Sequence, residues 1–378
     1  MGGGLSRTAA PPPPTAADRP PPPVLANCAR PAAFRAAAAA LYGADDWPGA
    51  GRLPVVFDDT YNIRLFGLER LHPFDSCKFG RVVALLEAAG ALRREELVAP
   101  RAATLEELAD VHAPEYLAAL EASSRKVAEV CELPLLALLP AAAVRHNVLA
   151  PMRLMAGGTL AAAALALRSG WALNVGGGMH HAHYAAGAGW CAYSDIFFAI
   201  RALRRASAGA VRRVLVVDTD AHQGNGVARS KLHFQDADTF ILDLYNASIW
   251  PQDAAAKAGV DVDAGVPSGT ADAAYLAALS AGLAEAFARF PRPDLVVYNA
   301  GTDVLADDPL GRLAVSPAGV VRRDEAVFAA AVAARAPIVM LLSGGYSKDS
   351  APCIARSVEN LGRRFALLPR LAAPREEP

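Results

Sequence analysis

The sequence has little net charge and few cysteines. Its 378 residues carry a formal net charge of −1, which gives no electrostatic reason to expect direct binding to DNA or RNA. The five cysteines are dispersed and form no C-x-x-C pair. Such a pattern is typical of reduced thiols in an intracellular compartment. We expect Cys191 to be a small buried thiol and not a nucleophile.

Long uninterrupted apolar runs are also lacking. Arg, Glu, Pro or Gly interrupts each alanine- and leucine-rich stretch before it reaches the length of a membrane span. We therefore predict no transmembrane segment.

Residues 1–52 are dominated by Pro, Ala and Gly, a composition that buries too little apolar surface to offset chain entropy. We predict a disordered segment there, with a possible short helix over residues 31–43. Two targeting interpretations stay open. The opening "MGGGLS" fits N-myristoylation at Gly2, and the shortage of acids, with Asp18 alone in the first forty residues, is typical of an organelle import peptide.

From Leu53 the sequence alternates short apolar runs with helical patterns, which predicts an α/β fold. Continuous apolar strands separated by helices indicate a central parallel sheet covered by helices on both faces. We expect one domain over residues 53–370 and a tail over 371–378. The predicted strands are 53–57, 171–175, 212–218, 239–244, 293–299 and 337–343, and the clearest helices are 157–169, 196–208, 272–289 and 318–335.

Polar, glycine-rich motifs follow four of these strands: "GGGMHH", "DTDAHQGNG", "NAGTD" and "SGGYSKD". The carboxyl ends of parallel strands meet at one edge of a sheet, where ligand sites form. The sequence therefore predicts an active site at that edge.

The segment "VVDTDAHQGNG" contains candidate metal ligands. A period of two places Asp218, Asp220 and His222 on one side of an extended chain, and Asp303 of "NAGTD" could join them. Two carboxylates and one imidazole would leave one position of a tetrahedral Zn²⁺ open, as catalysis requires. The alternative is that Asp218 and Asp220 cap a helix and His222 packs in the core.

Two carboxylates would neutralise a divalent cation, so such a metal would acidify water less than one bound by three histidines. A separate general base is then needed. The adjacent His180 and His181 of "NVGGGMHHA" could supply it, because imidazoles titrate near neutral pH.

Long motifs of this chain resemble those of the zinc-dependent histone deacetylases. They are "NVGGGMHHA", "GWCAYSDI", "DTDAHQGNG", "YNAGTDVLADDPLG", "SPAGVVRRDE" and "SGGY". The asparagine of "HQGNG" and the upstream "YNIRLFGLERLHPFDSCKFG" resemble the class IV branch. The resemblance covers residues 54–365 and implies an arginase/deacetylase-like fold that hydrolyses N6-acyl-lysine in histones or other proteins.

The resemblance also implies roles for individual residues. Asp220, His222 and Asp303 would bind zinc, one ion per chain. His181 would be the general base, and His180 its companion.

Further positions follow from the same resemblance. Asp218 would support His180, and Asn225 would support His181 where some classes have an aspartate, which would make His181 a weaker base. Tyr346 would donate a hydrogen bond to the oxyanion, an effect worth roughly 3–4 kcal/mol. The glycines of "GGG" would let the backbone approach the site without intruding side chains.

The family lines a substrate tunnel with aromatic residues. The matching positions here are Gly189 with Trp190 and, less directly, Trp250; either tryptophan could instead be ordinary core. Family members also bind potassium near the zinc. That ion would map to Asp218, Asp220, His222, Asp243 and Leu244, partly through backbone carbonyls.

Related chemistries and roles are compatible with the same fold. Two manganese ions on an arginase-like scaffold are disfavoured, since Gln223 and Asn225 replace charges. An acetylpolyamine amidohydrolase and a non-enzymatic corepressor scaffold also stay open. From the class IV features we predict slow deacetylation and faster removal of long fatty acyl groups. We expect the nucleus or cytoplasm as location, and corepressor or chromatin partners that present the substrate.

Overall fold

Seven parallel strands form the centre of a computed structural model that describes residues 25–44, 47–65 and 67–372. Their order across the sheet is β1-β2-β7-β6-β3-β4-β5. Every pair of neighbouring strands runs parallel, which confirms the predicted fold class. The strands are β1 (Val55–Val56), β2 (Trp171–Asn174), β3 (Val214–Asp218), β4 (Thr239–Asp243), β5 (Val262–Asp263), β6 (Leu295–Asn299) and β7 (Ile338–Leu341).

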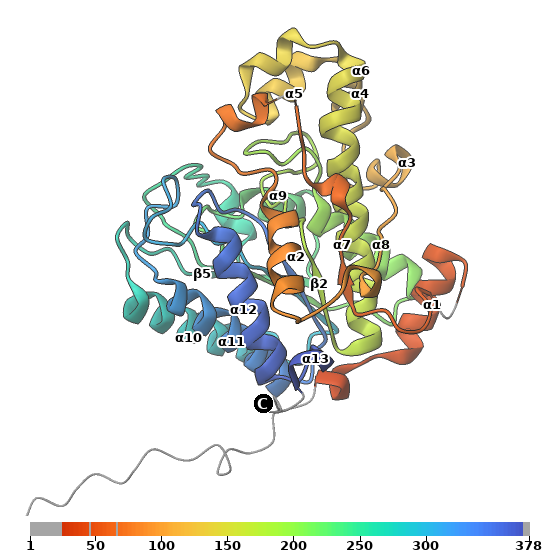
Figure 1. The fold of residues 1–378 in the computed structure, drawn as a ribbon, viewed down its shortest axis with the longest axis vertical. Coiled ribbons are helices and arrows are strands. Elements are labelled where there is room, and N and C mark those ends of the chain that lie inside the picture. The colour runs from red at the N-terminus through yellow and green to blue at the C-terminus, as the bar shows by residue number, and fades with distance from the viewer. Residues whose placement is uncertain (1–24, 45–46, 66, 373–378) are drawn as a thin grey trace, which may run out of the picture.

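Helices cover both faces of this sheet (Figure 1). The connections from β1 to β4 step one way across the sheet and carry α7, α8 and α9, whereas those from β5 to β7 step back and carry α10 and α11. Right-handed crossovers place the two groups on opposite faces. The helices are α1 (Pro31–Tyr42), α2 (Lys78–Ala88), α3 (Leu105–Leu108), α4 (Pro114–Ala122), α5 (Ser124–Val130), α6 (Ala141–Val144), α7 (Ala150–Ser169), α8 (Asp195–Ala206), α9 (Asn225–His233), α10 (Asp272–Arg289), α11 (Pro317–Ala333), α12 (Ser350–Arg364) and α13 (Pro369–Ala372).

All six predicted strands are present, shortened by one to three residues at their ends. The seventh strand, β5, was missed because its second residue is exposed and its surroundings, "DVDAG", contain no apolar run. The other edge strand, β1, is equally short but lies within the apolar run "LPVVF".

The folded region begins earlier than predicted. Residues 25–44 were expected to lie in a disordered segment, but Leu25 and Phe34 are buried and α1 packs against α7. Ala37 and Ala38 are also fully buried, because an alanine-rich helix can approach its neighbour closely. The possible helix over 31–43 is therefore confirmed, and the boundary at residue 53 is wrong. The myristoylation interpretation falls on residues 1–6, outside the described part, and the import-peptide interpretation, made for the first forty residues, falls there in part.

One continuous helical stretch, Ala141–Ser169, is long and apolar enough to cross a membrane, contrary to our expectation from the sequence. However, 83% of the most apolar part of this stretch is buried inside the domain, as expected for a core helix.

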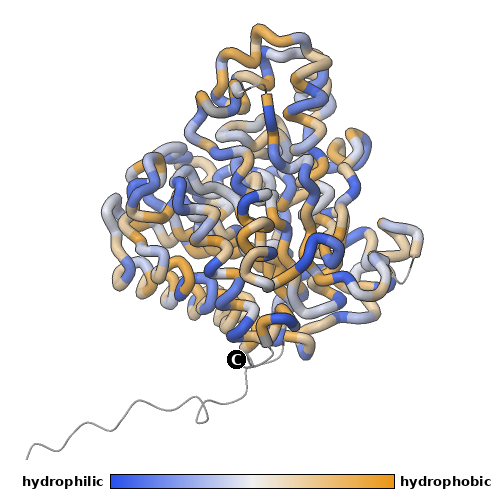
Figure 2. Tube along the Cα trace, in the orientation of Figure 1, coloured by the Kyte–Doolittle hydropathy of each residue, from blue (hydrophilic) through white to orange (hydrophobic). Residues whose placement is uncertain are grey.

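Exposed apolar side chains occur in another part of the molecule. Figure 2 shows hydrophobic residues at the tip of the projection above the sheet, where the 3-10 helix Pro134–Leu138 leaves Leu138 80% exposed.

Candidate active site

Three candidate metal ligands meet at the carboxyl edge of the sheet. Asp220 and His222 follow β3, and Asp303 follows β6. The Nδ1 atom of His222 lies 2.8 Å from Oδ2 of Asp303 and 3.2 Å from Oδ1 of Asp220. All three side chains are buried, and their ligand atoms lie within 4.8 Å of one another. Two carboxylates and one imidazole at these distances form a set that could hold one cation.

The electrostatics of this group also favour a cation. Burial and the nearby Asp220 raise the pKa of Asp303 to about 7, because two carboxylates so close together resist ionising at the same time. Burial lowers the pKa of His222, but hydrogen bonds to the two carboxylates outweigh it and raise that pKa to about 10. A divalent cation in place of these protons would neutralise both carboxylates.

The paired histidines differ in their environment. Nδ1 of His180 lies 2.8 Å from Oδ2 of Asp218, and this carboxylate with Asp220 overcomes the effect of burial and raises the pKa of His180 to about 9. Among the described residues, His181 has Asn225 and no carboxylate as its hydrogen-bond partner. Burial, followed by the neighbouring His180 and His222, lowers its pKa well below 6.5. The pKa values of the two imidazoles are thus shifted in opposite directions, although their ring centres lie only 4.0 Å apart.

Asn225, at the start of α9, connects His181 to a carboxylate that sequence reasoning did not identify. Its Oδ1 atom accepts a hydrogen bond from Nδ1 of His181 at 2.8 Å, and its Nδ2 donates to Asp253 at 3.2 Å. Asp253 also forms an ion pair with Arg229. The amide therefore orients the imidazole and transmits the polarising effect of a more distant carboxylate.

The glycine run preceding the histidines is required by crowding. Gly177 and Gly178 have φ values of +69° and +81°, which disfavour other residues, and a Cβ at Gly178 would lie 2.2 Å from Oδ1 of Asn299. The amides of Gly178 and Met179 donate to the buried carboxylate of Asp195 at 2.8 and 2.7 Å. The groups that crowd Gly177 and Gly178 include Asn299 and Asp195, so the expected close approach to the reacting groups stays a prediction. The two amide hydrogen bonds assign Asp195, present in "GWCAYSDI", to holding the turn.

Tyr346 projects from the loop after β7, and its ring centre lies 6.0 Å from that of His222. Burial and the nearby Asp220 and Asp303 keep the pKa of Tyr346 well above 10, so its hydroxyl stays a hydrogen-bond donor. The amide of Gly344 in this loop donates to Oδ2 of Asp220 at 3.0 Å. The same loop therefore carries the tyrosine and touches a metal ligand.

Lys78 donates hydrogen bonds to this loop and was not identified from the sequence. Its Nζ atom is fully buried and lies 2.6 Å from the carbonyl oxygens of both Ser343 and Gly344. Burial, partly opposed by Asp303 and Asp220, lowers its pKa to about 8. The only signal in the sequence was that the lysine of "SCKFG" falls on the apolar face of its helix, whereas lysine side chains usually point into solvent.

Two cavities meet at this site. The outer one, about 400 Å³, is lined by His222, Tyr346, Gly189 and Trp250 among others. Trp250 is 46% exposed, and its ring centre lies 4.6 Å from that of His181. A Cβ on Gly189 would lie 2.7 Å from the His181 ring, so only glycine fits beside it.

The inner cavity is narrower, about 50 Å³, and shares Gly189 and Tyr346 with the outer one. Trp190 lines it and is buried against Phe74, with ring centres 5.5 Å apart. Cys191 also lines it and is buried, as we expected. Burial raises the pKa of this thiol well above 9.

The residues expected around a second cation lie together as well. Asp218 and Asp243 are direct neighbours across β3 and β4, and the amide of Leu244 donates to the carbonyl of Asp218 at 2.9 Å. Oδ1 of Asp243 is buried and has no hydrogen-bond partner among the described residues. A buried carboxylate oxygen without a partner is costly, which favours a bound cation there.

Comparisons with known proteins agree with this geometry. Residues 72–361 match the histone deacetylase domain family. The chain is 43% identical over 317 residues to Histone deacetylase 2 of Arabidopsis thaliana, a match that covers 83% of this chain and 79% of that protein. It is 31% identical over 177 residues to an acetylpolyamine amidohydrolase of Burkholderia pseudomallei, covering 44% and 48%.

Solved structures show the same fold. The HDA15 HD domain has a TM-score of 0.63 and 23% identity, covering 85% of this chain and 98% of that one. An acetylpolyamine aminohydrolase from Burkholderia pseudomallei has a TM-score of 0.62 and 24% identity, covering 82% and 98%. The profile match over most of the chain and the relative at 43% identity establish that this protein belongs to the histone deacetylase domain family.

Proposed function

We propose that this protein is a zinc-dependent hydrolase that removes acyl groups from N6-acyl-lysine. The observation that carries the proposal is the buried Asp220-His222-Asp303 cluster, with His222 lining the outer cavity and its ring centre 6.0 Å from that of His181. Membership of a hydrolase family supports it.

Asp220, His222 and Asp303 would hold the metal. A histidine among two carboxylates suits Zn²⁺ better than Mg²⁺ or Ca²⁺, which prefer oxygen ligands alone. When bound, the zinc ion would polarise the acyl carbonyl and promote ionisation of water. The remaining chemistry belongs to side chains of this protein.

His181 is the proposed general base. Its lowered pKa keeps Nε2 free to accept a proton at neutral pH, and Asn225 fixes the ring by accepting a hydrogen bond from Nδ1. His181 takes a proton from the attacking water as the water oxygen bonds to the acyl carbon. The bond from that carbon to the lysine nitrogen then breaks, and His181 passes the proton to the leaving amine. The products are a carboxylate and a free lysine.

Tyr346 and His180 would stabilise charge during this sequence. The Tyr346 hydroxyl stays protonated and donates to the oxyanion that develops on the acyl oxygen. The Asp218 carboxylate would hold the His180 ring beside the general base, and a proton on His180 would oppose protonation of His181 and so favour return of the proton to the amine.

We propose a potassium ion at Asp218, Asp220, His222, Asp243 and Leu244. The unpaired Oδ1 of Asp243 supports this site. The cation would balance a carboxylate that lies directly beside Asp218 on the neighbouring strand.

The acyl group would enter the inner cavity, and we propose that long fatty acyl chains are removed faster than acetyl, as in a class IV enzyme. Three methionines support this: Met152, Met155 and Met179 line the cavity, and methionine repacks more readily than branched residues. At about 50 Å³ the cavity holds roughly four water-sized groups, so a long chain would need these side chains to move.

Protein substrates are favoured over free polyamines by the charges at the mouth. Glu132 and Arg312 both line the outer cavity, so the entrance has no excess negative charge to attract a polycation. The acetylpolyamine alternative still has support in the relatives that carry that name. A non-enzymatic scaffold is less consistent with a complete set of catalytic side chains.

The test is a kinetic series on one lysine peptide acylated with chains from acetyl to myristoyl, together with acetylated spermidine. Metal content is measured on the same preparation. We expect one zinc per chain and a rate that rises with chain length. A rate that falls steadily with length would refute the fatty-acyl preference alone, whereas turnover of the polyamine only would favour the alternative function.

A further inference from the structure

A groove at the opposite edge of the sheet carries three arginines that the proposed reaction does not use. Arg292 precedes β6 and Arg335 precedes β7, so both lie at the amino ends of strands whose carboxyl ends carry the active site. Arg30 reaches the same place because its amide donates to the carbonyl of Leu167, near the end of α7. A five-residue strand spans roughly 16 Å, which separates this groove from the catalytic cluster.

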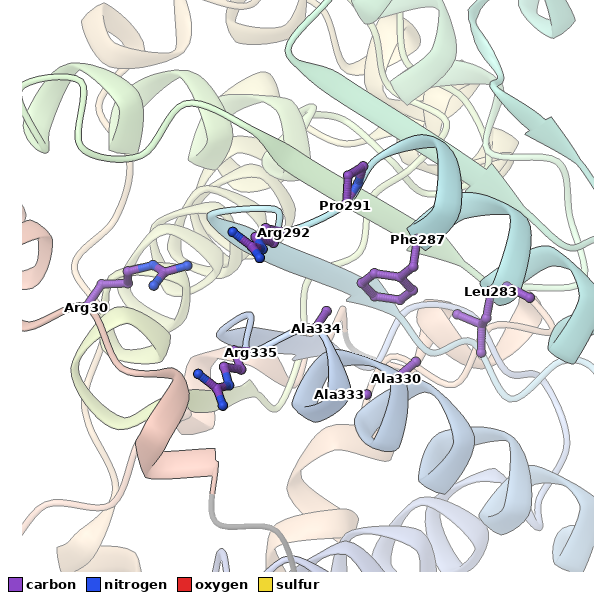
Figure 3. A pocket seen from close by; sticks show the side chains of 10 residues that line it. Arg30, Leu283, Phe287, Pro291, Arg292, Ala330, Ala333, Ala334 and Arg335 are labelled. Atoms are coloured by element: carbon purple, nitrogen blue, oxygen red, sulfur yellow. The ribbon is translucent and has the colours of Figure 1, made fainter.

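We name this feature the arginine groove and define it by Arg30, Arg292 and Arg335 at one end and Leu283, Phe287 and Ala330 along the other. Its volume is about 900 Å³. Figure 3 shows the three arginine side chains gathered at one end of the groove, with the Phe287 ring and Leu283 farther along it. The groove is therefore basic at one end and apolar at the other.

The positive charge is not balanced within the groove. Among the described residues that line it, none is acidic. Arginines nearby have carboxylate partners, such as Arg289 with Glu285 and Arg364 with Glu325. The helices α10 and α11 end beside the groove, but a helix terminus contributes only about half a negative charge. The end of α7, where Arg30 lies, adds a third such terminus, so three guanidinium groups against three termini leave a net charge of about +1.5.

The chemistry of the two ends defines the ligand. Guanidinium groups present paired donors that match the oxygens of phosphate, and the net charge matches a phosphate dianion better than a single carboxylate. A phosphate ion bound to the arginines would make no contact with the apolar side chains of Phe287 and Leu283. We propose that the arginine groove binds a small phosphate ester whose apolar or aromatic part packs against Phe287.

Phenyl phosphate is the probe, with inorganic phosphate as the control for its charged part and benzyl alcohol, an uncharged aromatic alcohol of similar size, as the control for its aromatic part. Binding to the full chain is measured by calorimetry or ligand-observed NMR, which require no enzymatic turnover. We expect phenyl phosphate to bind more tightly than inorganic phosphate, and benzyl alcohol to bind least. Equal binding of benzyl alcohol would overturn the proposal in favour of a purely apolar site, as would no binding of phenyl phosphate at about 10 mM.

Matched variants locate the site. Arg292→Gln with Arg335→Gln should weaken phenyl phosphate at least tenfold. Phe287→Ala should remove the advantage of phenyl phosphate over inorganic phosphate while leaving phosphate binding in place. Arg125→Gln, at an exposed position on α5, is the control for a general loss of charge and should change nothing. Equal affinity in the double variant and the control would refute the groove as the binding site, whatever the fate of the deacylase proposal.

Discussion

The two edges of one sheet differ in the burial of their charges. At the carboxyl edge, Asp218, Asp220, Asp243 and Asp303 are buried and depend on histidines, backbone amides or a cation. At the amino edge, Arg292 and Arg335 are exposed to water, where an unpaired charge costs little. Substitutions at the carboxyl edge should therefore have large effects on activity and stability, and those at the amino edge should affect ligand binding alone.

Loss of the metal should have the largest effect. Chelation, or Asp303→Asn, should lower kcat by roughly 10³-fold or more, because both carbonyl polarisation and water activation depend on the ion. The chelated protein should also melt at a lower temperature, since the buried carboxylates lose their counter-ion. Measurements are kcat, metal content and Tm, with the exposed Glu106→Gln as control. Full activity in verified metal-free protein would contradict the assignment.

Tyr346→Phe comes next. Removing one oxyanion donor typically lowers kcat about 10²–10³-fold, and KM should change little because the hydroxyl acts in the transition state. Tyr184→Phe removes a hydroxyl from a ring that stacks on His233, away from the metal cluster, and should leave kcat unchanged. A change confined to KM would mean that Tyr346 binds the substrate and does not stabilise the oxyanion.

Lys78→Met tests whether buried charge at the carboxyl edge also supports stability. It leaves two carbonyls without their donor and should cost about 1.5–3 kcal/mol. The folded pKa of about 8 lies below the unfolded value near 10.5, so the unfolded chain binds more protons between these values and wild-type stability should rise with pH there. The free energies of unfolding of wild type and Lys78→Met are measured with denaturant at several pH values. Their difference should increase with pH in this range. A difference independent of pH would contradict the lowered pKa.

Asn225→Asp should shift the pH profile. A carboxylate beside His181 would raise the pKa of this base, and because the base works only when neutral, the acid limb of kcat/KM should move to higher pH by about one unit. Asn225→Ser, which removes the amide without adding charge, is the control. An acid limb that stays in place in the aspartate variant would exclude His181 as the group that titrates.

The smallest effect is expected at the amino edge. Without ligand, Arg292→Gln with Arg335→Gln should alter the free energy of unfolding by no more than about 0.5 kcal/mol and leave deacylation unchanged, because exposed substitutions away from special contacts are nearly neutral. Chemical denaturation and the peptide assay measure both quantities. A loss of stability as large as that expected for Lys78→Met would contradict the proposed difference between the two edges of the sheet.

Local patterns made much of the fold predictable. Six strands could be read from apolar runs, since a strand buried on both faces shows its burial in its own sequence. The boundary at residue 53 failed for the opposite reason: an alanine-rich segment resembles disorder, and only its packing against α7 shows that Phe34 and Ala37 belong to the core.

The residues of the candidate site also fall into two groups, those that local sequence motifs predict and those that only the folded structure shows. His180, His181, Asp220 and His222 lie within two short motifs, so the sequence alone brought them to notice. Asp253 contacts Asn225 across 28 residues and Lys78 contacts Ser343 across 265, and no local pattern records such contacts.

The sequence by itself determined the sheet, the edge at which its polar residues gather, and the family to which the chain belongs. The tertiary structure decided which histidine has its pKa raised and which has it lowered, which lysine supports the tyrosine loop, and where three distant arginines converge. The physical reason is that a pKa or a cavity depends on atoms that meet only after folding, whereas strand burial and motif spacing are already present in the order of the residues.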